Sequence, residues 1–329
     1  MNKDKKILIT GASGFVGFHL IEAALNAGLE VFAAVRASSV TEQLKHLNIN
    51  FTTIDFSDKE AIRKNFEDNK YDYIIHAAGL TKARSLDEYN HVNAQYTQNL
   101  AEVAASFQVE KFVFLSSLAS VGPVKYNDES GVAENGKPQP VTEYGQSKLL
   151  AETMLEQIDN LPVIILRPTA VYGPREKDIF IWFKTLSTGL EPYIGRKNQW
   201  LSFVYVKDLA TLAVKALTSE TKKGTYNITD GNAYGRYELA ALSKRILNKK
   251  TLKFHVPMSL VKIIAGGLEK ISSANKPPTL SLEKLNELAA ENWKCNIERA
   301  RNELGFEPKY NLESGLQETL KWYKENKWL

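Results

Sequence analysis

The sequence has one cysteine, Cys295, among 329 residues, and it lacks long apolar runs. One cysteine cannot form an intramolecular disulfide, so this residue fits a reducing compartment and a role as a small half-buried side chain rather than a nucleophile. Lysines precede the apolar residues 7–9, but Thr10 and Gly11 end that run far short of a signal-peptide core. No apolar stretch approaches the roughly 20 residues that span a bilayer. We therefore expect a cytoplasmic protein without a membrane span.

The sequence also lacks a block of like charge. Its 42 basic and 38 acidic residues give a net charge of +4, which argues against a nucleic-acid partner. Hydrophobic residues make up 43% of the chain, enough for one large domain or two unequal ones. We find no internal repeat and expect no bound metal. These absences direct attention to small-molecule chemistry.

A glycine-rich turn follows the first apolar segment. Residues 5–10 predict a short buried strand that leads into G-x-x-G-x-x-G and then a helical pattern. Glycine permits positive φ and close backbone approach, and a helix amino terminus offers unpaired N–H groups to a pyrophosphate. The spacing differs from the G-x-G-x-x-G of the simplest Rossmann proteins, but the strand–turn–helix context indicates a dinucleotide site. The residues assigned to this contact are Gly11, Ser13, Gly14, Phe15, Val16 and Gly17.

The residue after the second predicted strand, 30–35, indicates which dinucleotide binds. A carboxylate at this place would accept hydrogen bonds from the adenosine ribose, but the chain has Arg36. A guanidinium suits a 2′-phosphate, so Arg36 favours NADP over NAD. The alternative is an exposed arginine on a loop.

Further apolar segments at 51–54, 71–75, 111–115 and 162–166 alternate with helical patterns. This alternation predicts a doubly wound α/β fold with a parallel sheet covered by helices on both faces. Asp55 either accepts a hydrogen bond from the adenine amine or caps the next helix, and we assign no chemistry to His76. The strand-end residues expected to contact the cofactor are Asp55, Phe56, Ala77, Ala78 and Gly79.

Three polar residues suggest proton transfer. Ser117 follows the fifth strand, at the edge where open α/β sheets bind ligands. Tyr144 and Lys148 are four residues apart in a predicted helix and so share one face. A nearby cation lowers the pKa of a phenol from about 10, which makes Tyr144 a candidate proton donor and acceptor. The spacing alone occurs by chance in many helices, and the glycine turn and Ser117 give it weight.

In chain order, the motifs resemble those of the extended short-chain dehydrogenase/reductases. The segments that carry this resemblance are Gly11-x-x-Gly14-x-x-Gly17, Asp55, His76-Ala-Ala-Gly79, Asn93, Ser116-Ser117, Tyr144-x-x-x-Lys148, Arg167-Pro168-x-x-Val171-Tyr-Gly-Pro174 and Phe203-Val-Tyr-Val-Lys-Asp208. The family includes nucleotide-sugar epimerases and dehydratases, dihydroflavonol reductase-like enzymes and 3β-hydroxysteroid dehydrogenase-like enzymes.

The resemblance implies a role for each motif residue. Ser117 would hold the substrate oxygen, Tyr144 would exchange a proton with it, and Lys148 would bind the nicotinamide ribose and lower the pKa of Tyr144. Asn93, Pro168 and Val171 would lie at the cofactor. The resemblance also implies a homodimer through the helices at 88–107 and 143–158.

The division of the chain follows from the same resemblance. We predict a Rossmann domain over 1–172, to which 201–224 returns, and a smaller α/β substrate domain from 173–200 and 225–329. An apolar helical stripe in that domain is expected to pack on its core rather than face the substrate. The stripe residues are Val261, Ile264, Ala265, Leu268 and Ile271.

Three functions remain open at this point. Arg36 favours an NADP-dependent carbonyl reductase or alcohol dehydrogenase. An NAD-dependent nucleotide-sugar epimerase is the second, and a non-catalytic NADP-binding sensor is the third. A 4,6-dehydratase is disfavoured, because Leu118 and Ala119 stand where that branch has an acidic pair after the catalytic residue. Loop 122–142 has no pattern that identifies the substrate.

Overall fold

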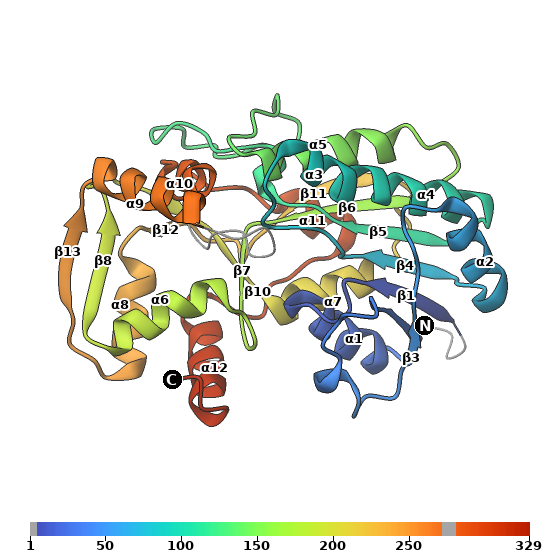
Figure 1. Ribbon diagram of the computed structural model, residues 1–329, viewed down its shortest axis with the longest axis horizontal. Coiled ribbons are helices and arrows are strands. Elements are labelled where there is room, and N and C mark those ends of the chain that lie inside the picture. Colours follow the sequence, from blue (N-terminus) through green and yellow to red (C-terminus); the bar gives the residue numbers. More distant parts are fainter. Residues whose placement is uncertain (1–4, 272–280) are drawn as a thin grey trace.

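The computed structural model describes residues 5–271 and 281–329, except the side chains of 270 and 271. Its largest element is a parallel seven-stranded sheet of order β11-β6-β5-β4-β1-β2-β3 (Figure 1). This arrangement confirms the predicted doubly wound α/β class. The strands are β1 (Lys6–Thr10), β2 (Glu30–Ala34), β3 (Asn50–Thr52), β4 (Tyr73–His76), β5 (Lys111–Leu115), β6 (Val163–Pro168) and β11 (Gly224–Ile228).

Helices cover both faces of this sheet and bury it on each side. Successive side chains of β1 show why its sequence is apolar throughout: Ile7 and Ile9 enter one core, and Leu8 enters the other. The first core is closed by α1 (Phe15–Asn26), α7 (Val206–Ala216) and α11 (Glu298–Leu304). The second is closed by α2 (Lys59–Asn69), α4 (Tyr96–Ser106) and α5 (Glu143–Glu156).

The helix expected at 88–107 contains an irregular turn. It begins as α3 (Leu86–Asn90), continues as a π-helical turn over His91–Gln95 and ends as α4. π-helical turns are rare and often occur at functional sites, and this one contains Asn93.

The second part of the chain lies beyond the carboxyl edge of the sheet (Figure 1). Its strands form three small pairs, and its aromatic core packs α12 (Leu312–Glu325) against α6 and α8. The remaining elements are β7 (Ala170–Tyr172), α6 (Asp178–Ser187), β8 (Leu190–Ile194), β9 (Trp200–Leu201), β10 (Phe203–Tyr205), β12 (Tyr234–Gly235), α8 (Glu238–Leu247), β13 (Leu252–Val256), α9 (Met258–Ile271) and α10 (Leu282–Ala289), with 3₁₀ turns at Glu42–Leu44 and Leu118–Ser120. None of the helices in the described ranges has the length and hydropathy of a membrane span.

The domain boundaries stay a proposal, with one qualification. Strand β11 pairs with β6 over its whole length, and α11 packs on the same sheet. Residues 224–228 and 298–304 therefore lie with the nucleotide-binding part, although all of them except Gly224 fall in the segment 225–329 assigned to the substrate domain.

Candidate active site

The glycine turn joins β1 to α1 in a conformation that only small residues permit. Gly11 has φ +68°, and a Cβ there would lie 2.6 Å from the Ala77 carbonyl oxygen. A Cβ on Gly17 would lie 2.1 Å from the Gly11 carbonyl oxygen. Gly14 is the N-cap of α1 and supplies no side-chain cap. The amino terminus of α1, with Phe15 and Val16 in its first turn, thus suits a pyrophosphate.

Side chains outside the turn fix its position. The Gln43 amide donates to the Ser13 carbonyl oxygen at 2.9 Å, and Arg175 donates to Gln43 at 3.0 Å. The Arg175 guanidinium also lies over the ring of Phe18, 3.8 Å from its centroid. Neither Gln43 nor Arg175 is part of a recognised motif, so no sequence signal indicates this contact.

The His76 side chain forms structural hydrogen bonds in the core, and we assign no chemistry to it. Its Nδ1 lies 2.7 Å from the Thr10 hydroxyl and its Nε2 lies 2.9 Å from the Thr97 hydroxyl. Burial lowers the pKa of His76 to about 3, and Lys148 acts in the same direction. The Thr10 hydroxyl also accepts from the backbone N–H groups of Ala77 and Ala78. This network holds the small residues after β4 beside the glycine turn.

At the far end of the expected cofactor site, Arg36 is exposed after β2, and its backbone N–H donates to the Ser39 hydroxyl. Among the described residues, its guanidinium has no hydrogen-bond partner. Asp55 is also exposed, and it accepts hydrogen bonds from the N–H and hydroxyl of Ser57. The alternative that Asp55 caps a helix is wrong, because Asp58 caps α2.

Asn93 joins the π-helical turn to the strand ends. Its side chain forms two hydrogen bonds with the Leu80 backbone and donates to the Ser147 hydroxyl at 3.0 Å. A Cβ on Gly79 would meet the Asn93 amide oxygen at 2.9 Å and Lys148 Nζ at 3.4 Å. Asn93, Gly79 and Lys148 therefore border one small space. Of the other residues assigned to the cofactor, Phe56 lies after β3, Pro168 ends β6 and Val171 lies in β7.

Ser117 and Tyr144 are brought together. Ser117 lies two residues after the end of β5 and caps a 3₁₀ turn, and Tyr144 lies in the first turn of α5. A hydrogen bond with Ser117 lowers the pKa of Tyr144, but burial has the larger effect and raises that pKa, and Glu287 also raises it. The sequence predicts that Lys148 lowers the pKa of Tyr144. In the chain by itself that pKa is raised, because desolvation outweighs the hydrogen bond.

Lys148 lies one turn further along α5, where its ammonium is buried. Nζ donates to the Leu115 carbonyl oxygen at 2.9 Å and lies 4.7 Å from the centroid of the Phe114 ring. Burial lowers the pKa of Lys148 to about 8, and Glu152 opposes this shift. The cation is therefore held at the carboxyl end of β5, the strand that leads into Ser117.

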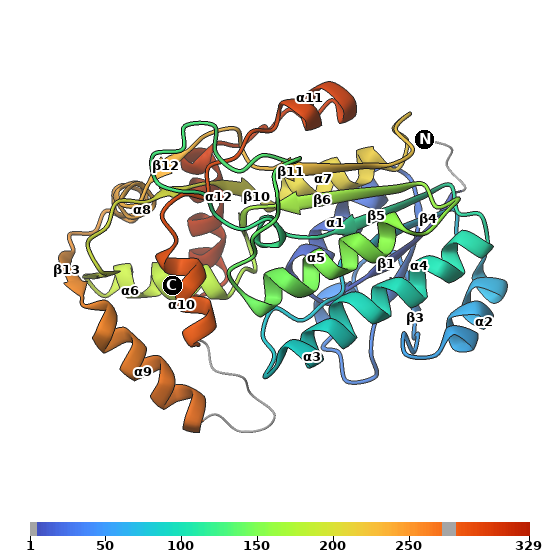
Figure 2. The same cartoon turned by 90° about the horizontal axis from the view of Figure 1, so that it is seen from above.

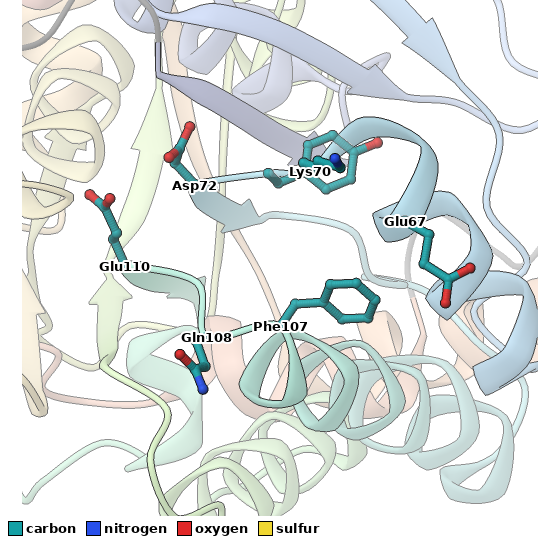
Figure 3. Close-up of a pocket in the computed structure, with 7 residues that line it drawn as sticks. Glu67, Lys70, Asp72, Phe107, Gln108 and Glu110 are labelled. Carbon is teal, nitrogen blue, oxygen red and sulfur yellow. The ribbon is translucent and has the colours of Figure 1, made fainter.

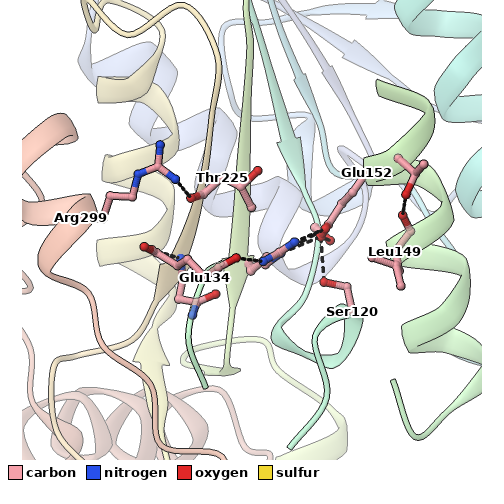
Figure 4. A network of polar contacts seen from close by, with 10 residues as sticks. Ser120, Glu134, Leu149, Glu152, Thr225 and Arg299 are labelled. Atoms are coloured by element: carbon pink, nitrogen blue, oxygen red, sulfur yellow. Dashed lines mark hydrogen bonds and ion pairs between the residues drawn. The ribbon is translucent and has the colours of Figure 1, made fainter. Parts of the chain in front are cut away.

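A buried ion pair joins α5 to β6 (Figure 4). Arg167 and Glu152 form a bidentate contact with a shortest distance of 2.5 Å, and both side chains are more than nine-tenths buried. The carboxylate also accepts hydrogen bonds from the hydroxyls of Ser116 and Ser120. The sequence identifies Arg167 and Ser116 only as motif residues. It does not indicate their common carboxylate partner, which lies far from both of them in the chain.

Helix α10 reaches the same site from the substrate part. The Glu283 carboxylate accepts from the Tyr144 backbone N–H at 2.9 Å. This contact joins residues 139 apart and has no sequence signal. It places a helix of the carboxyl third directly beside the candidate proton donor.

A pocket elsewhere does not belong to this site (Figure 3). Its volume is about 560 Å³, and its residues precede β4 and β5, so it lies at the amino ends of those strands, away from Ser117. Within the described residues, no cluster of His, Cys, Asp or Glu could hold a metal ion. The pocket is lined by Glu67, Lys70, Tyr71, Asp72, Phe107, Gln108 and Glu110.

The chain is similar to known proteins over most of its length. The model of the "NAD dependent epimerase/dehydratase family" matches residues 7–229. The chain is 26% identical to a ceramide reductase of Caulobacter vibrioides (98% of this chain, 96% of the relative). It is also 26% identical to the N-acetyl-α-D-glucosaminyl-diphospho-ditrans,octacis-undecaprenol 4-epimerase of Escherichia coli O157:H7 (96% and 94%). In fold, it is similar to the UDP-glucose 4-epimerase of Thermus thermophilus, solved with NAD (TM-score 0.77, 23% identity, 97% and 99% covered).

Proposed function

The chain belongs to the NAD dependent epimerase/dehydratase family and is an enzyme, and on that premise we propose a specific reaction. The protein is an NADP-dependent oxidoreductase that interconverts a carbonyl group and a secondary alcohol, with Tyr144 as general acid and base. The observation that carries this proposal is the proximity of the Ser117 and Tyr144 side chains, with Tyr144 one helical turn before Lys148 and the Lys148 ammonium beside Gly79.

The side chains have complementary roles in this reaction. When bound, the nicotinamide supplies or accepts the hydride. Ser117 holds the substrate oxygen, and Tyr144 donates its proton to the alkoxide that develops there. Burial raises the pKa of Tyr144, which keeps the phenol protonated at neutral pH and ready to donate. Lys148 holds the ribose hydroxyls, and its position beside Gly79 and Asn93 supports that role.

The mechanism is tested by Tyr144→Phe. We expect turnover to fall by about 100-fold or more, in line with loss of a general acid, while NADPH affinity stays unchanged. Tyr89→Phe is the matched control, because its ring lies 6.1 Å from that of Tyr144. Steady-state kinetics and NADPH fluorescence measure the two quantities. Near-normal turnover in Tyr144→Phe would remove Tyr144 from the mechanism.

The cofactor preference is tested by Arg36→Ala. The exposed Arg36 guanidinium after β2, which pairs with none of the residues in the described ranges, is available to a 2′-phosphate. We expect the Kd for NADPH to rise by about 10-fold or more, since charge-assisted hydrogen bonds contribute roughly 1.5–3 kcal/mol, with little change for NADH. Lys45→Ala is the control, because Lys45 is exposed and paired with Glu42. An equal effect on both cofactors would contradict NADP specificity.

A nucleotide-sugar epimerase is the second candidate function. The Escherichia coli relative and the Thermus thermophilus fold neighbour are epimerases by name. An epimerase oxidises and re-reduces the same carbon, so it interconverts sugar isomers without net NADPH consumption. Separate incubations with ketones, including sphingolipid ketones suggested by the ceramide reductase relative, and with UDP- or GDP-sugars distinguish the two. Binding of NADPH without either reaction would favour the non-catalytic sensor. A homodimer through α4 and α5 remains a proposal.

A further inference from the structure

Helix α9 lies in the substrate part, at the opposite end of the molecule from β3 (Figures 1 and 2). One face of this helix is apolar and exposed. Leu260, Ile263, Ile264 and Leu268 have 47%, 71%, 48% and 43% of their surface exposed. These positions recur at helical spacing, so they form one stripe along the helix. We call this stripe the α9 face. The prediction that the apolar stripe of this helix packs on its domain core holds for Val261 and Ala265, which are buried, but not for Ile264 and Leu268. The fifth stripe residue, Ile271, lies outside the described side chains.

The neighbouring side of α9 packs on the ribbon of β8 and β13. Val261 and Ala265 pack on Ile194 and Val256, which cover one end of the ribbon's outer side. The rest of that side is open, because three large apolar residues of the two strands are exposed. These residues are Leu190, Leu252 and Phe254.

This surface lies in the most basic part of the chain. Residues 244–270 contain seven lysines and arginines and one acidic residue, whereas the whole chain has a net charge of +4. The expectation of evenly spread charge therefore does not hold here. Lys244 and Arg245 are paired with glutamates. Among the described side chains, no ion pair involves the exposed Lys249, Lys250, Lys253 or Lys262.

One of these lysines faces the covered side of the ribbon. Lys253 Nζ lies 3.8 Å from the centroid of the Tyr237 ring, and Tyr237 packs with α6 and α8. The lysines at the two ends of the open side are Lys249 and Lys250, which precede β13, and Lys262 in α9.

We propose that the α9 face docks on an anionic lipid bilayer. Apolar side chains flanked by lysines suit the headgroup boundary of such a bilayer, where both burial and electrostatic attraction contribute. A second copy of the chain fits less well, because a twofold interface sets the same patch against itself and would oppose two positive surfaces.

Docking here would bring the bilayer close to the candidate active site. The Leu282 N–H of α10 donates to Glu269 of α9 at 2.8 Å, and Glu283 of α10 accepts from the Tyr144 N–H. The two helices thus connect the docked surface to the proton donor. If the proposed function holds, on which this step rests, the substrate is an amphiphile that lies in the bilayer and presents its carbonyl group to Tyr144.

The test is co-sedimentation with phosphatidylcholine vesicles that contain or lack phosphatidylglycerol. The full chain should bind the anionic vesicles more tightly. Ile263→Gln with Ile264→Gln should lower partitioning by about 10-fold or more, because two apolar side chains no longer enter the bilayer. Ile181→Gln in α6 is the matched control, since Ile181 is 49% exposed and lies away from this face.

Charge is tested separately. Lys249→Glu with Lys250→Glu should lower binding to anionic vesicles by about 20-fold or more. Lys222→Glu with Lys223→Glu reverses an equally exposed pair before β11 and should have a much smaller effect. All variants are exposed-site changes, and circular dichroism checks that they fold.

Three results would overturn the docking proposal. The first is failure of the full chain to bind vesicles, and the second is a loss of binding in the control variants as large as in the test variants. The third is a dimer in solution that binds no vesicles and that dissociates in the Ile263→Gln, Ile264→Gln variant. Docking and catalysis fail independently. Tyr144→Phe should bind vesicles normally even though its turnover is lost, and the α9 variants should retain NADPH oxidation with a water-soluble ketone.

Discussion

The nucleotide-binding part and the outer end of the substrate part differ in how fully they bury their apolar and polar groups. The seven-stranded sheet is covered on both faces. The ribbon of β8 and β13 is covered on one face by α6 and α8, and its other face is largely open. We call the nucleotide-binding part the closed part, because internal contacts hold the side chains on both faces of its sheet. We call the ribbon the open part, because its uncovered face is available to an external partner.

Buried carboxylates show the same contrast. Glu152 in the nucleotide part is enclosed with Arg167, and both are almost fully buried. Glu191 in the ribbon is equally buried, but its partner Lys244 is 27% exposed. The stability of the closed part thus depends on the pairing of Arg167 with Glu152. In the open part, water can reach Lys244 and so compensate for a lost pair.

The largest effect expected from this contrast comes from removing each cation. Arg167→Met leaves the Glu152 charge buried with only two hydroxyl partners, and we expect a loss of about 3–5 kcal/mol in the free energy of unfolding. Lys244→Met should cost at most about 2 kcal/mol, because water can replace the ammonium at Glu191. Urea unfolding measures both values. Equal losses in the two variants would show that the two parts exclude water equally well from their buried carboxylates.

Two glycines with nearly the same backbone sharpen the comparison. Gly11 has φ +68° and Gly195 has φ +63°. A Cβ on Gly195, in the substrate part, meets nothing within 4 Å, whereas on Gly11 it would contact the backbone of Ala77. Gly195→Ala should therefore cost only the backbone strain, about 1–2 kcal/mol, and Gly11→Ala about 1–3 kcal/mol more from overpacking. Thermal unfolding of the two variants tests this difference, and equal costs would contradict the close contact at Gly11.

The sequence predicts the closed part well. Strand periodicity, the glycine turn and the Ser117, Tyr144 and Lys148 spacing indicate the sheet and the edge where these residues lie, because each signal is local. Strand β11 lies outside the predicted nucleotide domain for nearly all of its length, since nothing within Gly224–Ile228 shows that it pairs with β6. The lysine near Tyr144 in the sequence predicts a lowered pKa for the phenol, but desolvation by the surrounding fold decides the direction.

The sequence predicts the open part least. The apolar periodicity of residues 258–271 is the same whether a helix face is buried or exposed, so it cannot show that Ile264 and Leu268 remain uncovered. The contact of Glu283 with Tyr144 depends on how two distant segments dock, and neither segment carries a motif for it.

The smallest expected effect concerns proton binding in the closed part. Burial lowers the pKa of Lys148 to about 8, against 10.5 for the unperturbed group. Between these values the unfolded chain binds more protons than the folded chain, so the free energy of unfolding should rise with pH. From about pH 8 to about pH 9.5 we expect a rise on the order of 1–2 kcal/mol in the cofactor-free protein, since the slope is at most about 1.36 kcal/mol per pH unit. The Lys148→Met variant lacks this group and should show a flatter profile in urea unfolding over the same range. Parallel profiles would mean that Lys148 is as well solvated in the folded chain as in the unfolded one, and the closed site would then be open to water at the residue expected to hold the ribose.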